Sequence, residues 1–491
     1  MLIGHLFSFF RRTVAFWYGR AGICCFWQTV ALCIDEQASA FFFSVRTVRW
    51  YGIIIRRNHI FTNENERFGE FWDILEQYRW EDNVKGIGIM IISISLAVLL
   101  FEWLAIVLLG RVFPMYRKKS VRIGCGVVAL ASLVLLYVSR YVPVGTIPEP
   151  LLKGSFWLLA APFALLVALP AVYALFRIMR VKPSKRDDSR RAFIKGVGIA
   201  VPALCYGSVG YGVFDKAGDL AVNRYAIAVR DLPTDLAGLR IAQLSDVHLG
   251  VFVSLEKLDE MLRLTEAERP DMLVITGDFI DGIDWTEEAM ARVAHLAEKL
   301  PYGAYFCWGN HEYLRDKGRI ARALDAYGIR VLKNEAVCVT NGARPLWLLG
   351  VDYPWARDLM IREGDRERMM AEAMADVPTD AVKVLLAHHS DFIEQGVKYG
   401  GDLTLTGHTH GGQFALGQTA LLPVQYRYMR GFYDAGGALG IAESTAADAP
   451  TKVGHGQPIG YVNSGAGSWF PLRLGCPPEV AIFTLVRNED S

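Results

Sequence analysis

The sequence has few cysteines and no excess of charge of either sign. Its 491 residues include eight cysteines and no CxxC pair, so neither a disulfide framework nor a thiolate zinc site organises the fold. The formal net charge is +1, whereas a nucleic-acid-binding surface usually needs a clear basic excess. We find no internal repeat. The composition therefore gives no support for a disulfide-rich module, a repeat protein or a nucleic acid partner.

Apolar residues are plentiful and unevenly distributed. They make up 52% of the chain and are concentrated in its first 215 residues. Four mostly apolar stretches of about 20 residues, the length that crosses a hydrocarbon core of roughly 30 Å, lie at 86–110, 123–142, 154–176 and 196–214. The last is the weakest, because it is rich in glycine and contains Pro202. We expect a transmembrane module at 84–214, a linker at 215–224 and a soluble domain at 225–491.

Residues 1–83 define no domain. Arginines interrupt their apolar runs, and no basic start, apolar core and cleavage site occur together as a secretory signal requires. We treat this stretch as a poorly defined N-terminal region, and leave open whether it is ordered or lies upstream of the true start. Mapping the N-terminus of the natively expressed protein decides between these interpretations.

Basic residues indicate the orientation in the membrane. They are frequent in the loops 111–122 and 177–191, but only one lies in the loop 143–153. By the positive-inside rule the two basic loops are cytoplasmic, so we expect a multi-pass protein of the cell membrane with an extracytoplasmic C-terminal domain. The segment Ser-Arg-Arg-Ala-Phe-Ile-Lys at 189–195 resembles a twin-arginine export signal, although it lies deep in the chain. It suggests the twin-arginine export machinery as a partner.

The second half alternates strand-like and helix-like segments, which predicts an α/β domain. The expected helices are 255–267, with Ser254 as its N-cap, and 287–300. The expected strands are 239–244, 272–276, 304–308, 346–350, 382–387, 403–406 and 460–463. Residues 434–458 are rich in alanine and glycine, and we expect a long loop there.

Five short polar clusters follow expected strands. They read DVH at 246–248, GDFID at 277–281, GNHE at 309–312, HH at 388–389 and GHTHGG at 407–412, and they hold six of the ten histidines. Side chains at the carboxyl ends of strands are where α/β folds generally place their sites. Mixed carboxylate, amide and imidazole donors suit Zn, Mn or Fe better than Ca. The clusters therefore predict a metal site.

Each cluster also has an ordinary structural interpretation. Asp246 could cap a helix, Asp278 and Asn310 could form turns, and His388 could be a satisfied core histidine. Five such coincidences in this order are improbable, so we favour a metal site. A structural role, or one in supporting the ligands, is the better interpretation for Asp281, Glu312 and His389. His295 and His455 are expected to be ordinary surface residues.

The order of these five motifs resembles the calcineurin-like metallophosphoesterase family, especially its membrane-attached bacterial branch. The similarity covers about residues 239–485, and all five motifs are intact. It implies a four-layer αββα sandwich that holds two divalent ions. By this resemblance, one ion is held by Asp246, His248 and His410, the other by Asn310, His388 and His408, and both by Asp278. His311 is the candidate catalytic residue, which can stabilise the transition state or protonate the leaving group.

This resemblance predicts a membrane-anchored phosphohydrolase that cleaves phosphomonoester, phosphodiester or pyrophosphate bonds with metal-activated water. The aromatic pair Trp469 and Phe470 is open to two interpretations. It either contacts a lipid-linked phosphate substrate near the bilayer or belongs to the core, in which case a water-soluble phosphodiester is the competing substrate. From another functional class, a catalytically silent membrane sensor or scaffold with the same fold is the alternative.

Overall fold

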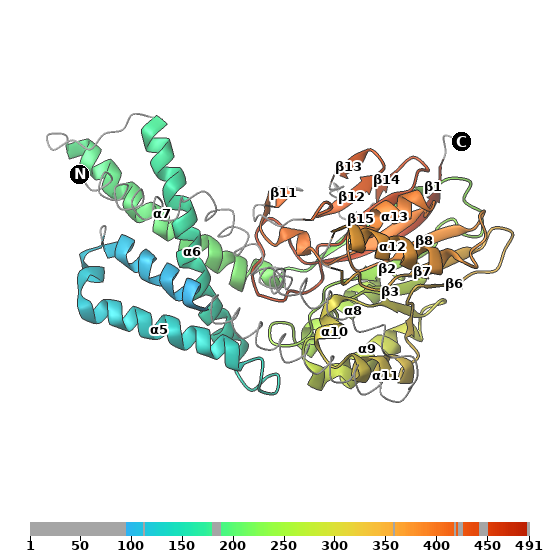
Figure 1. The fold of residues 1–491 in the computed structure, drawn as a ribbon, viewed down its shortest axis with the longest axis horizontal. Helices are drawn as coiled ribbons and strands as arrows, with labels where there is room; N and C mark the ends of the chain where they lie inside the picture. Colours follow the sequence, from blue (N-terminus) through green and yellow to red (C-terminus); the bar gives the residue numbers. More distant parts are fainter. Residues whose placement is uncertain are drawn as a thin grey trace, which may run out of the picture. The chain divides into compact units, whose positions relative to one another are not determined.

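The computed structural model describes residues 95–110, 113–178, 188–356, 359–416, 419–420, 426–440 and 450–488 (Figure 1). The N-terminal region 1–83 and the first nine residues of the expected span 86–110 lie outside these described residues. The chain divides into two compact units. We call them the helical unit, Met1–Leu133 with Leu159–Cys205, and the sandwich unit, Val134–Leu158 with Tyr206–Ser491.

Three helices are long and apolar enough to cross a membrane: α5 (Lys119–Val138), α6 (Glu149–Ile178) and α7 (Asp188–Phe214). A shorter apolar helix covers Ser95–Gly110. Large apolar side chains of α5 are exposed, for example Val127 at 61% and Leu130 at 50%. Contiguous apolar surface of this kind needs an apolar environment, which a bilayer provides. These three helices therefore indicate membrane association.

The sandwich unit contains two mixed sheets of seven strands. In the first sheet the strand order is β14-β1-β16-β2-β3-β4-β5, and only the β16–β2 pair is antiparallel. Its strands are β1 (Ala221–Val229), β2 (Arg240–Leu244), β3 (Met272–Thr276), β4 (Ala304–Cys307), β5 (Arg330–Val331), β14 (Thr451–Val453) and β16 (Glu479–Arg487). The consecutive parallel strands β2, β3 and β4 therefore end at the same edge.

The second sheet has the order β13-β12-β15-β9-β8-β7-β6, with β15, β9, β8 and β7 parallel. Its strands are β6 (Glu335–Cys338), β7 (Leu346–Gly350), β8 (Val382–Leu386), β9 (Leu403–Thr406), β12 (Gly431–Asp434), β13 (Gly437–Gly440) and β15 (Ile459–Val462). A separate hairpin pairs β10 (Ala415–Leu416) with β11 (Thr419–Ala420).

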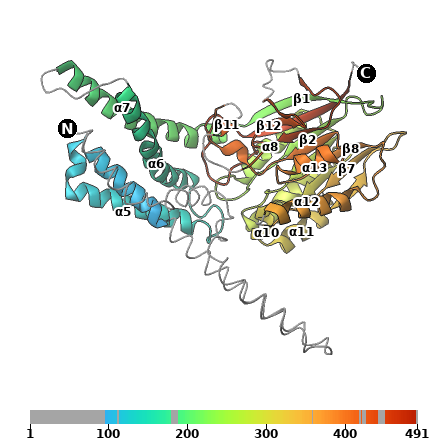
Figure 2. The same cartoon turned by 45° about the horizontal axis from the view of Figure 1, so that its top comes forward.

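Helices cover the outer face of each sheet. Along β3, Leu273 and Ile275 face one core cluster and Met272 and Val274 face another, as the period of two in a strand requires. The outer cluster packs the first sheet against α8 (Leu255–Ala267), α9 (Thr286–Ala297) and α11 (Lys317–Ala326). The other cluster fills the space between the two sheets. On the far side, α12 (Leu359–Met374) and α13 (Phe392–Lys398) cover the second sheet (Figure 2). The expected αββα order is confirmed.

The strands that were not expected from the sequence lie in segments with little apolar alternation. The strand β1 begins at Ala221, inside the stretch expected to be a linker, and pairs in parallel with β16 along all nine residues. The strands β13 and β14 lie inside the expected loop 434–458, of which residues 441–449 lie outside the described chain. The other expected strands and the helix with N-cap Ser254 are present within two residues of their expected ends.

Candidate metal centre

The five polar clusters meet where strands of the two sheets end. Asp246 follows β2, Asp278 follows β3 and Asn310 follows β4, whereas His388 follows β8 and His408 follows β9. Hydrogen bonds join the two edges: the backbone N–H of His408 donates to both carboxylate oxygens of Asp246, each at 3.0 Å. His388 Nδ1 also lies 2.7 Å from the carbonyl oxygen of Thr276. The structure thus brings together all seven side chains that the resemblance implies as ligands.

One group of donors consists of Asp246, His248 and His410. His248 Nε2 lies 2.9 Å from His410 Nε2, and His410 Nε2 lies 3.5 Å from Asp246 Oδ1. The ligand atoms of the three residues all lie within 4.8 Å of one another. At least one of two facing imidazole nitrogens must present its lone pair, so this arrangement suits a cation at the centre of the group.

A second group consists of Asp278, His388 and His408, whose ligand atoms also lie within 4.8 Å of one another. His388 Nε2 is 3.0 Å from Asp278 Oδ2 and 3.1 Å from His408 Nδ1. The amide oxygen of Asn310 lies 3.2 Å from His388 Nε2, so it can add a hard oxygen donor. Asp278 Oδ2 is also 3.8 Å from His248 Nε2 in the first group. The carboxylate of Asp278 therefore lies next to both groups.

The backbone at these residues is unusual. Nine non-glycine residues in the described chain have positive φ, and five of them are candidate ligands: Asp246, His248, Asp278, His408 and His410. Side chains disfavour this left-handed region, and such strain is concentrated at functional sites. Glycine is needed beside them, because a Cβ at Gly309 would collide with the carboxylate of Asp278. The fold accepts unfavourable backbone geometry in order to bring the donors together.

The protonation of the donors bears on whether a cation fits. Burial raises the pKa of Asp278, but the neighbouring imidazoles outweigh this effect and hold the pKa well below its usual range. Burial, followed by the charge of a neighbouring histidine, lowers the pKa of both His408 and His410. Ionised carboxylates and neutral imidazoles are the forms that bind metals. The donor set therefore fits divalent cations.

His388 differs from the other imidazoles. Burial lowers its pKa, but the carboxylates of Asp278 and Asp246 outweigh this effect and raise the pKa to about 9. Burial also raises the pKa of Asp246. A cation between these groups would replace the proton as the positive charge that compensates the carboxylates. A positive charge thus compensates the buried carboxylates, and a divalent cation can take this role.

His311 lies beside both groups. Its Nδ1 is 2.7 Å from Asp281 Oδ1, and its Nε2 is 4.0 Å from Asp278 Oδ2. Asp281 is also 3.3 Å from His248 Nδ1 and accepts from Arg315 at 3.1 Å. The carboxylate of Asp281 therefore fixes the orientation of His311 and His248. His248, Asp281 and His311 could also hold a metal together. The position of His311 therefore suits either a proton donor or a metal ligand.

Glu312 anchors two of the loops. Its fully buried carboxylate accepts hydrogen bonds from the backbone N–H groups of Asp278 at 3.0 Å, Phe279 at 2.7 Å and Gly309 at 3.0 Å. A fourth, weaker contact reaches the N–H of Ile280 at 3.3 Å. The side chain thus holds the loops after β3 and β4 in one position, as its expected supporting role requires.

Replacement of Glu312 by alanine is expected to lower the free energy of unfolding by about 3 kcal/mol or more, because several buried N–H groups lose their acceptor. Urea unfolding of the full chain in detergent, followed by near-ultraviolet circular dichroism, measures the change. Glu298→Ala, at an exposed glutamate after α9, is the control. A loss below about 1 kcal/mol for Glu312→Ala would show that the loops hold their positions without this carboxylate.

Three residues at the site were not predicted from the sequence: Tyr353, Tyr426 and Arg473. The hydroxyls of Tyr353 and Tyr426 lie 3.3 and 2.9 Å from His408 Nε2, so they orient its ring. Arg473 is fully buried and donates to the carbonyl oxygens of His410 at 3.0 Å and of Ser464. Tyr353 follows β7, and the rule that polar residues after strands form the site could have identified it.

His389 takes a different position from its neighbour His388. Its ring is buried and stacks on the ring of His408 with a centroid distance of 5.2 Å and an interplanar angle of 29°. Burial, together with the charge of His408, holds its pKa well below the usual range. A neutral, stacked His389 supports the position of His408.

A two-sheet α/β sandwich with two adjoining groups of carboxylates and imidazoles at its strand ends defines a metal-dependent hydrolase. Comparison with known proteins indicates that the bond is a phosphoester, because the calcineurin-like phosphoesterase family matches residues 239–412. A metallophosphoesterase of Aquifex aeolicus is 32% identical over 272 residues, which cover 54% of this chain and 92% of that protein. The chain belongs to the calcineurin-like phosphoesterase family and is a metal-dependent phosphoesterase.

Two further relatives show the range of proteins that are similar to this chain. The phosphodiesterase YaeI of Escherichia coli is 28% identical over 308 residues, which cover 61% of this chain and 99% of that protein. A transmembrane protein with a metallophosphoesterase domain from Danio rerio is 33% identical over 214 residues, which cover 41% of this chain and 47% of that protein. Relatives of this kind thus include proteins described as transmembrane.

Proposed function

We propose that this protein is a membrane-anchored phosphohydrolase that uses two divalent ions, Mn, Zn or Fe, to cleave phosphomonoester, phosphodiester or pyrophosphate bonds outside the cytoplasm. The observation that carries this proposal is the position of Asp278, whose carboxylate adjoins both groups of donors. One ion would be held by Asp246, His248 and His410, the other by Asn310, His388 and His408, and both by Asp278.

The ions, when bound, would neutralise the phosphoryl oxygens and activate a water molecule for in-line attack. Hydrolysis forms a bond between phosphorus and the water oxygen and breaks the bond to the leaving oxygen, which takes up a proton. His311 Nε2 can supply this proton, because the contact of Nδ1 with Asp281 directs Nε2 toward Asp278. Glu312 and Arg473 keep the surrounding loops in place.

A lipid-linked phosphate is the substrate that we favour. The ring of Trp469 lies 5.9 Å from the ring of His311, and Phe470 stacks on Phe156 at 5.6 Å. Phe156 belongs to the first turns of the apolar helix α6, so the aromatic pair beside the site contacts an apolar helix. A substrate embedded in the membrane surface could reach this aromatic pair, whereas a water-soluble phosphodiester needs no contact of this kind.

The test compares detergent-dispersed lipid phosphates with bis-p-nitrophenyl phosphate and p-nitrophenyl phosphate, using the full chain with Mn, Zn or Fe added. Faster turnover of a lipid phosphate supports the proposal. Turnover of the soluble diester alone favours the water-soluble substrate. A chain that binds two ions yet hydrolyses none of these compounds would favour the catalytically silent sensor or scaffold.

The proposed side of the membrane is supported by the connection between α5 and α6. Residues 134–158 belong to the sandwich unit, and Val144 in this connection packs against the loop at Gly282. The weakly basic α5–α6 loop and the sandwich would then face the same, extracytoplasmic side. Proteinase K added to spheroplasts is expected to degrade the sandwich while a cytoplasmic marker stays intact. Protection of the sandwich until the membrane is lysed would place it in the cytoplasm.

Export would involve the twin-arginine-like segment 189–195, which forms the first turns of α7. An Arg190→Lys, Arg191→Lys protein is expected to leave the sandwich untranslocated if the twin-arginine machinery reads this segment. Wild-type cleavage of the sandwich by added proteinase K in this variant would exclude that machinery as a partner.

A further inference from the structure

Arg140 lies next to the active site although it belongs to the connection between two apolar helices. It follows α5 by two residues, is exposed, and places its guanidinium carbon 4.8 Å from the centroid of the Trp469 ring. The ring of Trp469 in turn meets the ring of His311 edge-on, with an interplanar angle of 75°. Arg140 is therefore two ring contacts away from the proposed proton donor.

Several contacts hold this arrangement in place. Phe470 stacks on Phe156 at an interplanar angle of 20°, and the carbonyl oxygen of Gly212, at the end of α7, accepts from the N–H of Arg473 at 3.2 Å. The side chain of Arg473 also donates to Ser468 Oγ at 2.9 Å. The segment from Ser468 to Arg473 is thus attached to α6, to α7 and to the metal centre. Its fixed position sets the position of the guanidinium above Trp469.

We infer that Arg140, positioned on the face of Trp469, binds a second anionic group carried by the leaving group of the substrate. A guanidinium presents planar donors that match phosphate or carboxylate, and stacking on an indole reduces the freedom it loses on binding. The leaving group would lie on the side of the site where Trp469 contacts His311, because His311 is the residue that gives it a proton. The inference rests on the proposed function and narrows the substrate to esters with an anionic leaving group.

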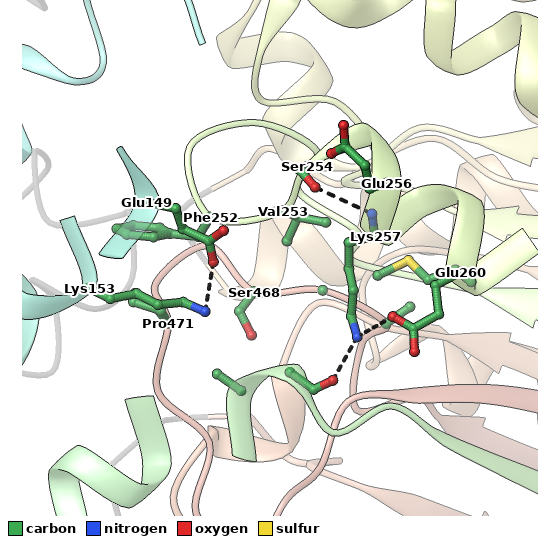
Figure 3. A pocket seen from close by; sticks show the side chains of 15 residues that line it. Glu149, Lys153, Phe252, Val253, Ser254, Glu256, Lys257, Glu260, Ser468 and Pro471 are labelled. Carbon is green, nitrogen blue, oxygen red and sulfur yellow. Dashed lines mark hydrogen bonds and ion pairs between the residues drawn. The ribbon is translucent and has the colours of Figure 1, made fainter. Parts of the chain in front are cut away.

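The cavity beside the same segment is a poorer place for an anion. It has a volume of about 300 Å³, and carboxylates neutralise its lysines (Figure 3). Lys153 contacts Glu149 and Lys257 contacts Glu260, each at 2.7 Å. With Glu256 also in its wall, that cavity has no excess of positive charge for an anion.

The test uses two pairs of substrates that differ in one anionic group on the leaving group. The soluble pair is methyl 4-nitrophenyl phosphate and methyl 3-carboxy-4-nitrophenyl phosphate. The lipid pair is phosphatidylglycerol and phosphatidylglycerol phosphate in mixed micelles, with the released water-soluble alcohol measured. Full-length wild type, Arg140→Ala and Arg140→Lys are compared after metal loading. Arg319→Ala is the control, because Arg319 is a surface residue of α11 that pairs with Glu287.

In Arg140→Ala we expect kcat/KM for the anionic member of a pair to fall about tenfold, mainly through KM, because a charge-assisted hydrogen bond is lost. The other member should change less than about twofold, and Arg140→Lys should recover part of the loss. An effect in the lipid pair alone identifies a lipid headgroup as the source of the anion. An effect in the soluble pair identifies a soluble ester.

Equal losses for both members of each pair would assign Arg140 a structural role, and no loss in either pair would remove it from the site. Both results overturn the inference while leaving the phosphohydrolase itself intact. A metal-loaded wild type that hydrolyses neither these compounds nor bis-p-nitrophenyl phosphate would instead reject the proposed function, and the inference with it.

Discussion

An Asp278→Asn protein is expected to lose at least about 10³-fold in kcat and to bind fewer than two ions per chain. The reason is the position of the carboxylate, which lies 3.0 Å from His388 Nε2, 3.8 Å from His248 Nε2 and 4.0 Å from His311 Nε2. Asparagine keeps the shape of this side chain but removes the negative charge that two cations would share. Stabilisation of charge in metal-assisted hydrolysis amounts to several kcal/mol, which corresponds to a factor of this size.

Two measurements on the same preparation check this expectation: elemental analysis of bound metal and turnover of bis-p-nitrophenyl phosphate. Asp259→Asn is the matched control, because Asp259 pairs with Arg292 on the surface, where an ion pair contributes little. If Asp278→Asn kept two ions and more than about a tenth of the wild-type rate, its carboxylate would not be shared between the ions. The single observation that carries the proposed function would then be lost.

The positions of the candidate ligands follow from the sequence because strands and polar residues alternate in a simple way. Asp246, Asp278 and His388 each come within two residues of the end of a buried strand, and strands that run parallel end at a common edge. Motif order and chemistry could therefore identify the site before the fold was known. The partner of each donor could not be identified in this way, because it depends on how the edges of the two sheets meet.

Other parts of the site depend on contacts between distant residues. Arg473 lies in none of the five polar clusters, yet it holds the carbonyl oxygen of His410 across 63 positions in the sequence. The strand β1 begins with residues that are only partly buried, and it is defined by pairing with β16 more than 250 residues later. Local pattern contains no information about such long-range contacts. Tertiary packing alone decides these elements.

Trp469 illustrates the same point at the level of one side chain. From its sequence context, Trp469 could belong to the core or contact the substrate. In the structure it is partly buried, and its ring lies between the ring of His311 and the guanidinium of Arg140. Hydropathy alone cannot distinguish a core aromatic from one that lines a site, since both bury most of their surface.

The second large effect is expected for His311→Ala, which should lower kcat for esters with an alkoxide leaving group by about 10²- to 10⁴-fold while bound metal stays at the wild-type level. His311 Nδ1 contacts Asp281 at 2.7 Å, and its backbone N–H donates to Asp278 Oδ1 at 2.8 Å. The backbone contact survives the substitution, so Asp278 should stay in position. Alanine removes the group that protonates the leaving oxygen. His295→Ala, at an exposed histidine of α9, is the control.

Substrates with different leaving groups distinguish the two possible roles of His311, proton donor and metal ligand. If His311 supplies a proton, the loss in His311→Ala should be large for a methyl phosphodiester, whose alkoxide must be protonated, and small for a 4-nitrophenyl ester, whose phenolate leaves unaided. If His311 is a metal ligand, which its grouping with His248 and Asp281 allows, the His311→Ala protein should lose bound metal and should lose activity toward both esters. Equal loss with reduced metal content would move His311 into the ligand set, and proton delivery would then have to come from another group.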